Sequence, residues 1–246
     1  MTTNLSDEQR FSSIKENIEI IRSHIAEAAV KSGRNYEDIR LMAVTKTVDP
    51  IFINYSIDEC GIDLIGENKV QEFLLKKDSL HLEHVEKHII GHLQTNKVNK
   101  IIDCVDMIQS VDSLHLAKEI SKRASALNIT ADILLEINIG SEESKTGFDK
   151  IEMYESLSAF SELPGIEVKG IMTIPPICED KKKLCSYFYE MAQCYNDIKE
   201  KSFGNFNMSI LSMGMSGDYT DAVENGSNMV RIGSLIYGAR LYNNKI

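Results

Sequence analysis

The sequence has no tryptophan, only 4 prolines and no long uncharged apolar run. A helix that crosses a membrane needs roughly 20 consecutive apolar residues, and no segment approaches that length. The N-terminal region mixes charged residues such as Asp7, Arg10 and Lys15 with its apolar positions, unlike a secretory signal peptide. These absences argue against membrane-spanning and exported proteins, so we expect a soluble cytoplasmic protein.

Cysteine is scarce and irregularly spaced. The 5 cysteines form no C-x-x-C pair, and they are Cys60, Cys104, Cys178, Cys185 and Cys194. An odd number without such pairs disfavours a disulfide framework and a structural zinc site. We expect reduced thiols.

Positive charge is also in the minority, since 27 lysines and arginines face 37 acidic residues and leave a net charge of -10. A field of that sign repels nucleic acid and anionic lipid. We therefore expect neither nucleic acid nor membrane as a partner, although a local cationic pocket for a small anion remains compatible with the sequence.

The N-terminal region contains a strong helical pattern. Its apolar positions recur at spacings of three and four and form one stripe; they are Phe11, Ile14, Ile18, Ile21, Ile25 and Ala28. Ser6 and Gln9 match a capping box, and Gly33 supplies a stop. Residues 1–35 are therefore expected to contribute an extra N-terminal helix that packs on the rest of the protein.

The remaining chain alternates short apolar runs with helical patterns. The expected strands are residues 41–44, 63–65, 87–90, 107–109, 133–139, 167–171, 209–211 and 229–231. The clearest helices are 113–126 and 179–201. Strands separated by helical crossovers predict an α/β fold, namely a single parallel (β/α)8 TIM-type barrel occupying residues 1–246 as one domain. A doubly wound open sheet is the alternative.

Functional residues of such barrels lie after the carboxyl ends of the strands. Two loops expected after the seventh and eighth strands are rich in glycine and serine, which permit close backbone approach and supply hydroxyl donors. The residues are Ser212, Gly214, Ser216, Gly217, Gly233 and Ser234. We predict a phosphate site there, with ordinary turn residues as the alternative for either loop alone.

Lys46 follows the first expected strand. Partial burial and a nearby Arg231 would lower the pKa of its amine and favour Schiff-base formation. A phosphate site beside a carbonyl-reactive lysine fits pyridoxal 5′-phosphate, or a phosphorylated sugar in a class I aldolase. A surface lysine without such a role is the plain alternative.

Six motifs carry a resemblance to a known family. They are Ala-Val-Thr-Lys-Thr (43–47), Gly-Glu-Asn (66–68), Ile-Gly-His-Leu-Gln-Thr-Asn-Lys (90–97), Ser-Lys-Thr-Gly (144–147), Leu-Ser-Met-Gly-Met-Ser (211–216) and Arg-Ile-Gly (231–233). In this order they resemble the YggS/PROSC family of pyridoxal phosphate homeostasis proteins. The resemblance runs from about residue 41 to residue 240.

The resemblance implies a fold-type III barrel, like the N-terminal domain of alanine racemase, that holds pyridoxal phosphate as a Schiff base on Lys46. It places Ser212, Ser216, Gly233 and Ser234 at the cofactor phosphate, with Ser234 where the family often carries threonine. It places Arg231 at the pyridine nitrogen, Asn68 beside Lys46, and Met172 near the ring.

An arginine at the ring nitrogen makes the cofactor a weak electron sink, because a permanently charged guanidinium favours the unprotonated ring. Racemases of this fold also draw a tyrosine from a second domain, for which we expect 246 residues to leave no room. We therefore expect a monomeric protein without efficient catalysis that serves vitamin B6 and amino-acid homeostasis, with apo pyridoxal phosphate enzymes as partners. The alternative is a fold-type III amino-acid racemase, and weak racemase-like activity is compatible with the main reading.

Two further signals concern lysine and histidine. Lys145 is a candidate secondary site for the cofactor aldehyde, although a solvated loop lysine is the simpler interpretation. His81, His84, His88 and His92 have spacings that resemble a metal site, but we expect exposed histidines with His92 at the rim, and no metal.

Overall fold

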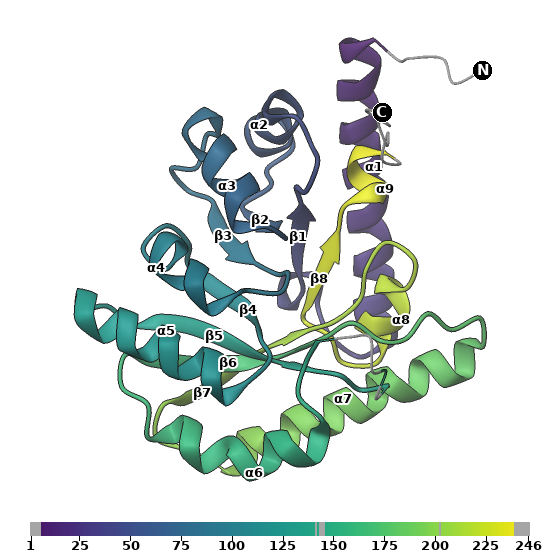
Figure 1. Ribbon diagram of the computed structural model, residues 1–246. Coiled ribbons are helices and arrows are strands. Elements are labelled where there is room, and N and C mark those ends of the chain that lie inside the picture. Colours follow the sequence, from purple (N-terminus) through teal and green to yellow (C-terminus); the bar gives the residue numbers. More distant parts are fainter. Residues whose placement is uncertain (1–5, 141, 143–145, 202, 239–246) are drawn as a thin grey trace.

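Eight parallel strands close into a barrel in chain order (Figure 1). This computed structural model describes residues 6–140, 142, 146–201 and 203–238. Strand β1 (Arg40–Val44) pairs with β2 (Leu64–Glu67) on one side and with β8 (Met229–Ile232) on the other. The other strands are β3 (Glu86–Ile89), β4 (Met107–Val111), β5 (Ala131–Ile137), β6 (Ile166–Thr173) and β7 (Phe206–Ser212). The predicted parallel barrel is confirmed, and the open sheet is excluded.

Helices follow the strands around the outside of the barrel. They are α2 (Pro50–Asp58), α3 (Val70–Lys76), α4 (Val98–Ile101), α5 (Leu114–Leu127), α6 (Lys150–Ser161), α7 (Lys181–Lys201), α8 (Tyr219–Glu224) and α9 (Ser234–Tyr237). Short 3₁₀ turns lie at η1 (Tyr36–Asp38), η2 (Lys77–Ser79) and η3 (Thr95–Lys97). Within the described part of the chain, none of the helices is both long and apolar enough to cross a membrane.

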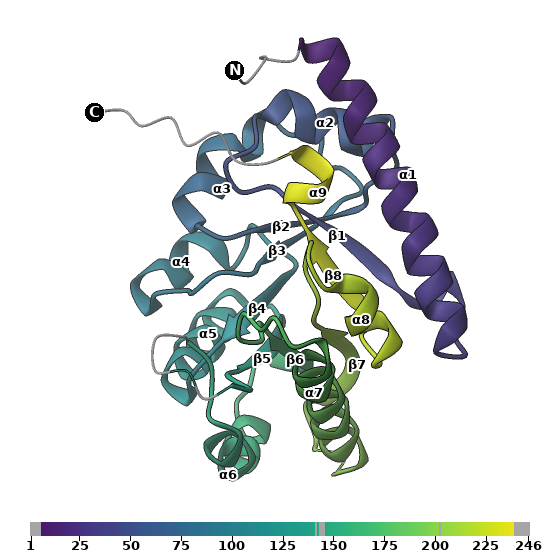
Figure 2. The same cartoon turned by 90° about the vertical axis from the view of Figure 1, so that its right-hand side faces the viewer.

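Helix α1 (Asp7–Lys31) precedes the barrel. Its start is the predicted capping box of Ser6 and Gln9, and Gly33 follows its end with a φ of +72°. The isoleucines and alanine of its apolar stripe are buried, and the helix lies beside α2, α8 and α9 (Figure 2). An amide hydrogen bond of 3.1 Å from Asn17 to the carbonyl of Ile236 joins it to α9. The helix therefore packs on the ring of helices beside β1 and β8.

Alternate residues of each strand face the helices or the barrel interior. On β1, Leu41 and Ala43 belong to the outer core, whereas Met42 and Val44 belong to an inner cluster. That inner cluster also contains Leu64, Ile90 and Met229, and a second one consists of Met107, Leu134 and Met172. The barrel is a packed core, and its charged and polar interior residues are therefore costly unless they are paired.

Several predicted strand bounds were wrong. β7 spans 206–212 where 209–211 was predicted, and β6 spans 166–173, so Ser212 and Met172 lie within strands and do not follow them. β5 begins and ends two residues earlier than predicted, at 131 and 137. The apolar runs mark only the buried middle of each strand, whereas pairing with neighbouring strands fixes the ends.

Candidate functional site at the carboxyl end of the barrel

Lys46 lies two residues beyond the end of β1 and is half-buried. The adjacent strand β8 places Arg231 opposite Met42, so Arg231 lies deeper in the barrel than Lys46. The chain after β8 passes close to the same point, since a Cβ on Gly233 would lie 3.1 Å from the carbonyl oxygen of Val44. The carboxyl ends of β1 and β8 thus form one corner of the barrel mouth.

Arg231 is a buried cation with a fixed orientation. Its side chain donates to Ser212 Oγ through Nη1 and to the carbonyl of Thr173 through Nη2, each at 2.8 Å. Burial lowers the pKa of Arg231 to about 10, while the nearby carboxyl groups of Glu136 and Asp218 oppose that shift. The guanidinium therefore remains charged at pH 7.

The loops that follow β7 and β8 lie side by side. The backbone N–H of Arg231 donates to the carbonyl of Gly214 at 3.0 Å, and the N–H of Leu235 donates to Ser216 Oγ at 3.4 Å. Ser234 is exposed beside these contacts. Hydroxyl groups and close backbone near a buried cation suit a small anion such as a phosphate.

Gly214 provides a test of this loop. Its φ is +96°, and a Cβ there would lie 2.6 Å from Ala222 Cβ and 3.0 Å from Tyr219 Cα. We expect Gly214→Ala to lower the free energy of unfolding by about 2–4 kcal/mol, because it adds left-handed strain to overpacking. Urea unfolding measures the loss. Gly217→Ala is the matched control, since a Cβ at Gly217 meets nothing within 4 Å; equal stability of the two variants would contradict the expectation.

Asn68 follows β2 and contributes an amide to the mouth. Among the described residues, its Oδ1 is a buried atom that accepts no hydrogen bond. The loop after β3 presses on the same residue, because a Cβ on Gly91 would lie 2.4 Å from the carbonyl oxygen of Asn68. A buried acceptor without a donor costs free energy, so this amide fits a site that a ligand completes.

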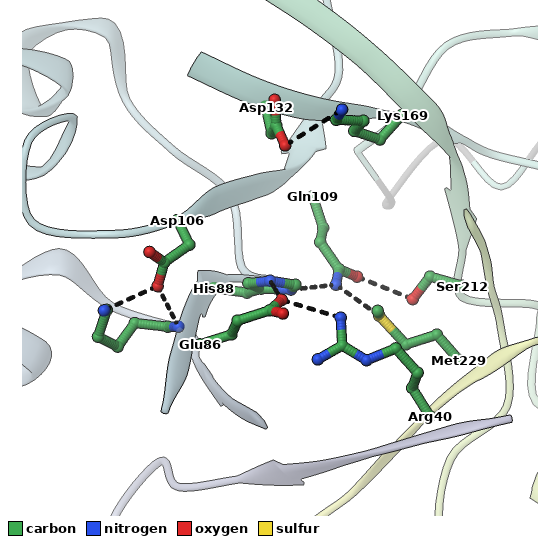
Figure 3. A network of polar contacts seen from close by, with 10 residues as sticks. Arg40, Glu86, His88, Asp106, Gln109, Asp132, Lys169, Ser212 and Met229 are labelled. Carbon is green, nitrogen blue, oxygen red and sulfur yellow. Dashed lines mark hydrogen bonds and ion pairs between the residues drawn. The ribbon is translucent and has the colours of Figure 1, made fainter. Parts of the chain in front are cut away.

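A chain of polar side chains runs through the barrel interior from Ser212, the hydrogen-bond partner of Arg231, to Arg40 (Figure 3). Ser212 Oγ donates to Gln109 Oε1 at 2.8 Å, and Gln109 Nε2 lies 2.9 Å from His88 Nδ1. His88 Nε2 lies 3.3 Å from Glu86 Oε2, which in turn accepts from Arg40 at 2.9 Å. The chain joins the mouth to the opposite end of the barrel.

His88 is only 2% exposed, so the prediction of an exposed histidine was wrong. Desolvation by burial lowers its pKa, although Glu86 opposes the shift, and the ring is therefore neutral. The hydrogen bond from His88 lowers the pKa of Glu86 to about 2, with burial opposing and Arg40 adding to the shift. Neutral His88 then donates through Nε2 to the Glu86 carboxylate and accepts at Nδ1 from Gln109.

This buried histidine predicts acid sensitivity. Below about pH 6.5 the unfolded chain binds a proton at His88 that the folded chain does not, so stability falls as the pH falls. We expect His88→Gln to reduce that fall by up to about 1.4 kcal/mol per pH unit. Urea unfolding between about pH 7.5 and about pH 5, a range that spans the ordinary pKa of histidine, measures how the free energy of unfolding depends on pH. The exposed His84→Gln should retain the wild-type slope, and equal slopes for both variants would refute the role of His88.

Comparison with known proteins shows the family to which the chain belongs. Residues 10–241 match the alanine racemase N-terminal domain family. The pyridoxal phosphate homeostasis protein of Aquifex aeolicus is 39% identical over 227 residues, which cover 92% of this chain and 98% of that protein. The corresponding protein of Escherichia coli is 34% identical over 235 residues, with 94% and 99% covered. The chain belongs to the pyridoxal phosphate homeostasis protein family.

Solved structures of similar proteins have the same fold as this chain. An unknown protein from Bifidobacterium adolescentis has a TM-score of 0.89 at 35% identity, covering 95% of this chain and 98% of that chain. PipY of Synechococcus elongatus, solved with PLP bound, has a TM-score of 0.81 at 26% identity, covering 92% and 100%. An alanine racemase of Clostridium difficile is 18% identical with a TM-score of 0.69 and shares the fold; this chain covers 57% of it.

In this member of the pyridoxal phosphate homeostasis family, some of the predicted site residues lie at the barrel mouth and others lie inside the barrel. Lys46, Asn68 and the loop residues Ser216, Gly233 and Ser234 follow strands at the barrel mouth, and Arg231 is the last residue but one of β8. Ser212 and Met172 lie inside the barrel, where Ser212 bonds Arg231 and Met172 packs in the inner cluster. Lys145 and Ser144 lie outside the described residues. The role of each residue stays a prediction.

Two buried charged residues near the mouth of the barrel, Glu136 and Lys76, were not predicted from the sequence. Glu136 is buried on β5, its Oε1 accepts from Thr146 at 3.1 Å, and burial raises its pKa. Its Oε2 is another buried atom without a hydrogen bond among the described residues. Glu136 stands as the one charged residue in the apolar run 133–137, which was the available signal. Lys76 on α3 gave no comparable signal, because it looks like a surface lysine in the sequence.

Proposed function

We propose that this chain binds pyridoxal 5′-phosphate covalently on Lys46 in the cytoplasm and supplies it to apo-enzymes, without an efficient reaction of its own. The observation that carries the proposal is the pairing of β1 with β8, which places the lysine that follows β1 at the same end of the barrel as a buried, charged arginine on β8. The pyridoxal phosphate homeostasis proteins among its relatives, and the PLP bound to PipY, support the choice of ligand.

The residues at the mouth fit this cofactor. Its aldehyde condenses with an amine to a Schiff base, and its phosphate needs donors. Lys46 supplies the amine, which forms the C=N bond with loss of one water. Ser216, Gly233 and Ser234 offer hydroxyl and backbone donors at adjacent loops. The buried Asn68 Oδ1, which lacks a donor among the described residues, is a ready acceptor.

Arg231 supports a holding role over catalysis. Its guanidinium is fixed by Ser212 and Thr173 and remains charged at pH 7. A cation that keeps its protons does not protonate a ring nitrogen, so the ring withdraws electrons weakly. We propose that Arg231 orients the ring and that Ser212 holds Arg231, with Met172 packed below.

The test is the visible absorbance of the purified protein mixed with pyridoxal 5′-phosphate, before and after addition of an apo pyridoxal phosphate enzyme. We expect absorbance of the lysine-bound cofactor that decreases as the added enzyme gains activity. A colourless protein, or a colour that never transfers, would contradict the proposal. Loss of chirality of an amino acid at roughly 1 per second or faster would favour a racemase instead.

A further inference from the structure

A buried lysine from α3 lies behind the segment that carries Lys46. Lys76 Nζ is 2.8 Å from Glu67 Oε2, 2.9 Å from Glu72 Oε1 and 2.8 Å from the carbonyl oxygen of Thr45. The side chain of Lys76 is 9% exposed, and that of Glu67 is 2% exposed. An ammonium has three N–H donors, so each has an acceptor here. Lys76 is thereby committed to these contacts.

These contacts hold the residue before Lys46. The carbonyl of Thr45 accepts from Lys76, and the Thr45 hydroxyl lies 3.1 Å from Glu67 Oε2. The backbone N–H of Thr45 donates to the carbonyl of Gly66 at 3.0 Å. The peptide that enters Lys46 is thus fixed by both the β2 backbone and the buried ion pair.

The residue after Lys46 is held by the same cluster. Thr47 has a φ of +62°, which is unfavourable for a β-branched residue. Its backbone N–H donates to Glu72 Oε1 at 2.5 Å, the same oxygen that accepts from Lys76. Glu72 therefore holds a strained turn in place, and strain of this kind persists only where neighbouring contacts determine it.

Asn68 is connected to the cluster as well. Glu67 Oε1 accepts from the backbone N–H of Asn68 at 3.0 Å, while its other oxygen accepts from Lys76. Burial raises the pKa of Glu67, and Lys76 opposes that shift. For Glu72, burial also acts upward, but the hydrogen bonds from Lys76 and Thr47 outweigh it and lower the pKa. Two carboxyl groups with opposite shifts thus share one ammonium.

Stability alone explains this arrangement poorly. Burying an ion pair costs desolvation, and an apolar pair of the same volume often stabilises a fold as well or better. The contacts instead converge on Thr45, Thr47 and Asn68, which surround the lysine of the proposed site. We infer that Lys76 is a positioning residue, which with Glu67 and Glu72 fixes the backbone on both sides of Lys46 so that its amine meets the aldehyde of pyridoxal 5′-phosphate. This inference rests on the proposed function.

Two probes separate positioning from general binding. Pyridoxal 5′-phosphate reports the rate of Schiff-base formation by its absorbance, and pyridoxine 5′-phosphate, which has an alcohol in place of the aldehyde, reports noncovalent affinity. We expect Lys76→Met to slow Schiff-base formation at least about tenfold, since misplacing a reacting group by about 1 Å can cost on the order of 100-fold. Its affinity for pyridoxine 5′-phosphate should stay within about twofold of wild type, a 0.4 kcal/mol difference by the usual conversion of about 1.4 kcal/mol per tenfold.

Lys77→Met is the matched control, because Lys77 is the next residue, is more exposed and pairs only at 3.6 Å with Asp78. It should form the Schiff base at the wild-type rate. If Lys76→Met does not fold, Glu72→Ala decides, because Glu72 is partly exposed and its removal frees Thr47. Glu72→Ala should also slow the reaction with unchanged pyridoxine 5′-phosphate affinity.

The outcomes separate the positioning role of Lys76 from the proposed binding of pyridoxal 5′-phosphate on Lys46. A wild-type rate in folded Lys76→Met, or in Glu72→Ala, overturns the positioning role, as does a parallel loss of rate and pyridoxine 5′-phosphate affinity. Schiff-base formation by the wild type and by Lys77→Met leaves the proposed function standing in either case. Failure of the wild type to form the Schiff base overturns both proposals.

Discussion

Lys46→Ala is expected to abolish the visible absorbance of the lysine-bound cofactor and its trapping by borohydride. The physical reason is the loss of the one amine at the corner formed by β1 and β8 that the proposed chemistry uses. Phosphate contacts through Ser216, Gly233 and Ser234 should remain, so pyridoxine 5′-phosphate should still bind. Absorbance spectra and equilibrium binding of the two ligands measure these effects together.

Lys69→Ala serves as the control for this variant. Lys69 is exposed after β2, one residue beyond Asn68, and its side chain makes no capping hydrogen bond to α3. Its removal tests whether the loss of an exposed lysine near the mouth is enough to change the absorbance of the lysine-bound cofactor. Lys69→Ala should match wild type, and retention of full absorbance by Lys46→Ala would contradict the assignment.

Arg231→Met is expected to lower the free energy of unfolding by about 3 kcal/mol, because removal of one member of a buried polar cluster leaves the others unpaired. Ser212 loses a donor, the carbonyl of Thr173 loses its guanidinium partner, and the carboxyl groups of Glu136 and Asp218 lose a nearby positive charge. Cofactor binding should weaken as well, since the site loses its buried cation. Urea unfolding and ligand titration measure the two effects.

Two further variants show whether the stability loss in Arg231→Met comes from the buried guanidinium. Arg231→Lys keeps the charge but cannot reproduce the two-pronged contact, so it should fall between wild type and Arg231→Met. Arg123→Met removes an arginine whose ion pair with Glu119 lies on the surface of α5, and it should leave unfolding unchanged. Wild-type stability of Arg231→Met would refute the buried cluster as described.

The charge distribution explains how an acidic chain can hold an anionic cofactor. The net charge is -10, and a field of that sign disfavours extended polyanions. At the mouth, however, Arg231 is buried and charged, and Lys46 follows the neighbouring strand β1. Electrostatic interactions are stronger where water is excluded, so a local cation can dominate over a distant negative surface.

Much of the fold was predictable because its signals are local. The capping box of Ser6 and Gln9 and the glycine that follows α1 are both read from a few neighbouring residues. The order of strands and helices predicted the barrel, and the barrel rule then predicted that Lys46 and the two glycine-rich loops share one end. Strand ends were less predictable, since pairing sets them.

The polar interior was not predictable, because its contacts join distant positions. Gln109 and Ser212 are 103 residues apart, and their hydrogen bond exists only once the barrel closes. His88 was misjudged because two charged residues, Glu86 and Lys87, directly precede it. In a closed barrel even a short polar strand sends alternate side chains into the core. Lys76 was missed for a similar reason, since its burial depends on the β1 and β2 ends.

The most direct test of the account is to mix the wild-type protein with pyridoxal 5′-phosphate, reduce it with borohydride and map the labelled peptides by mass spectrometry. The account predicts one principal pyridoxyl group, located on Lys46. A label spread over surface lysines, a principal label on another lysine, or no label would contradict it.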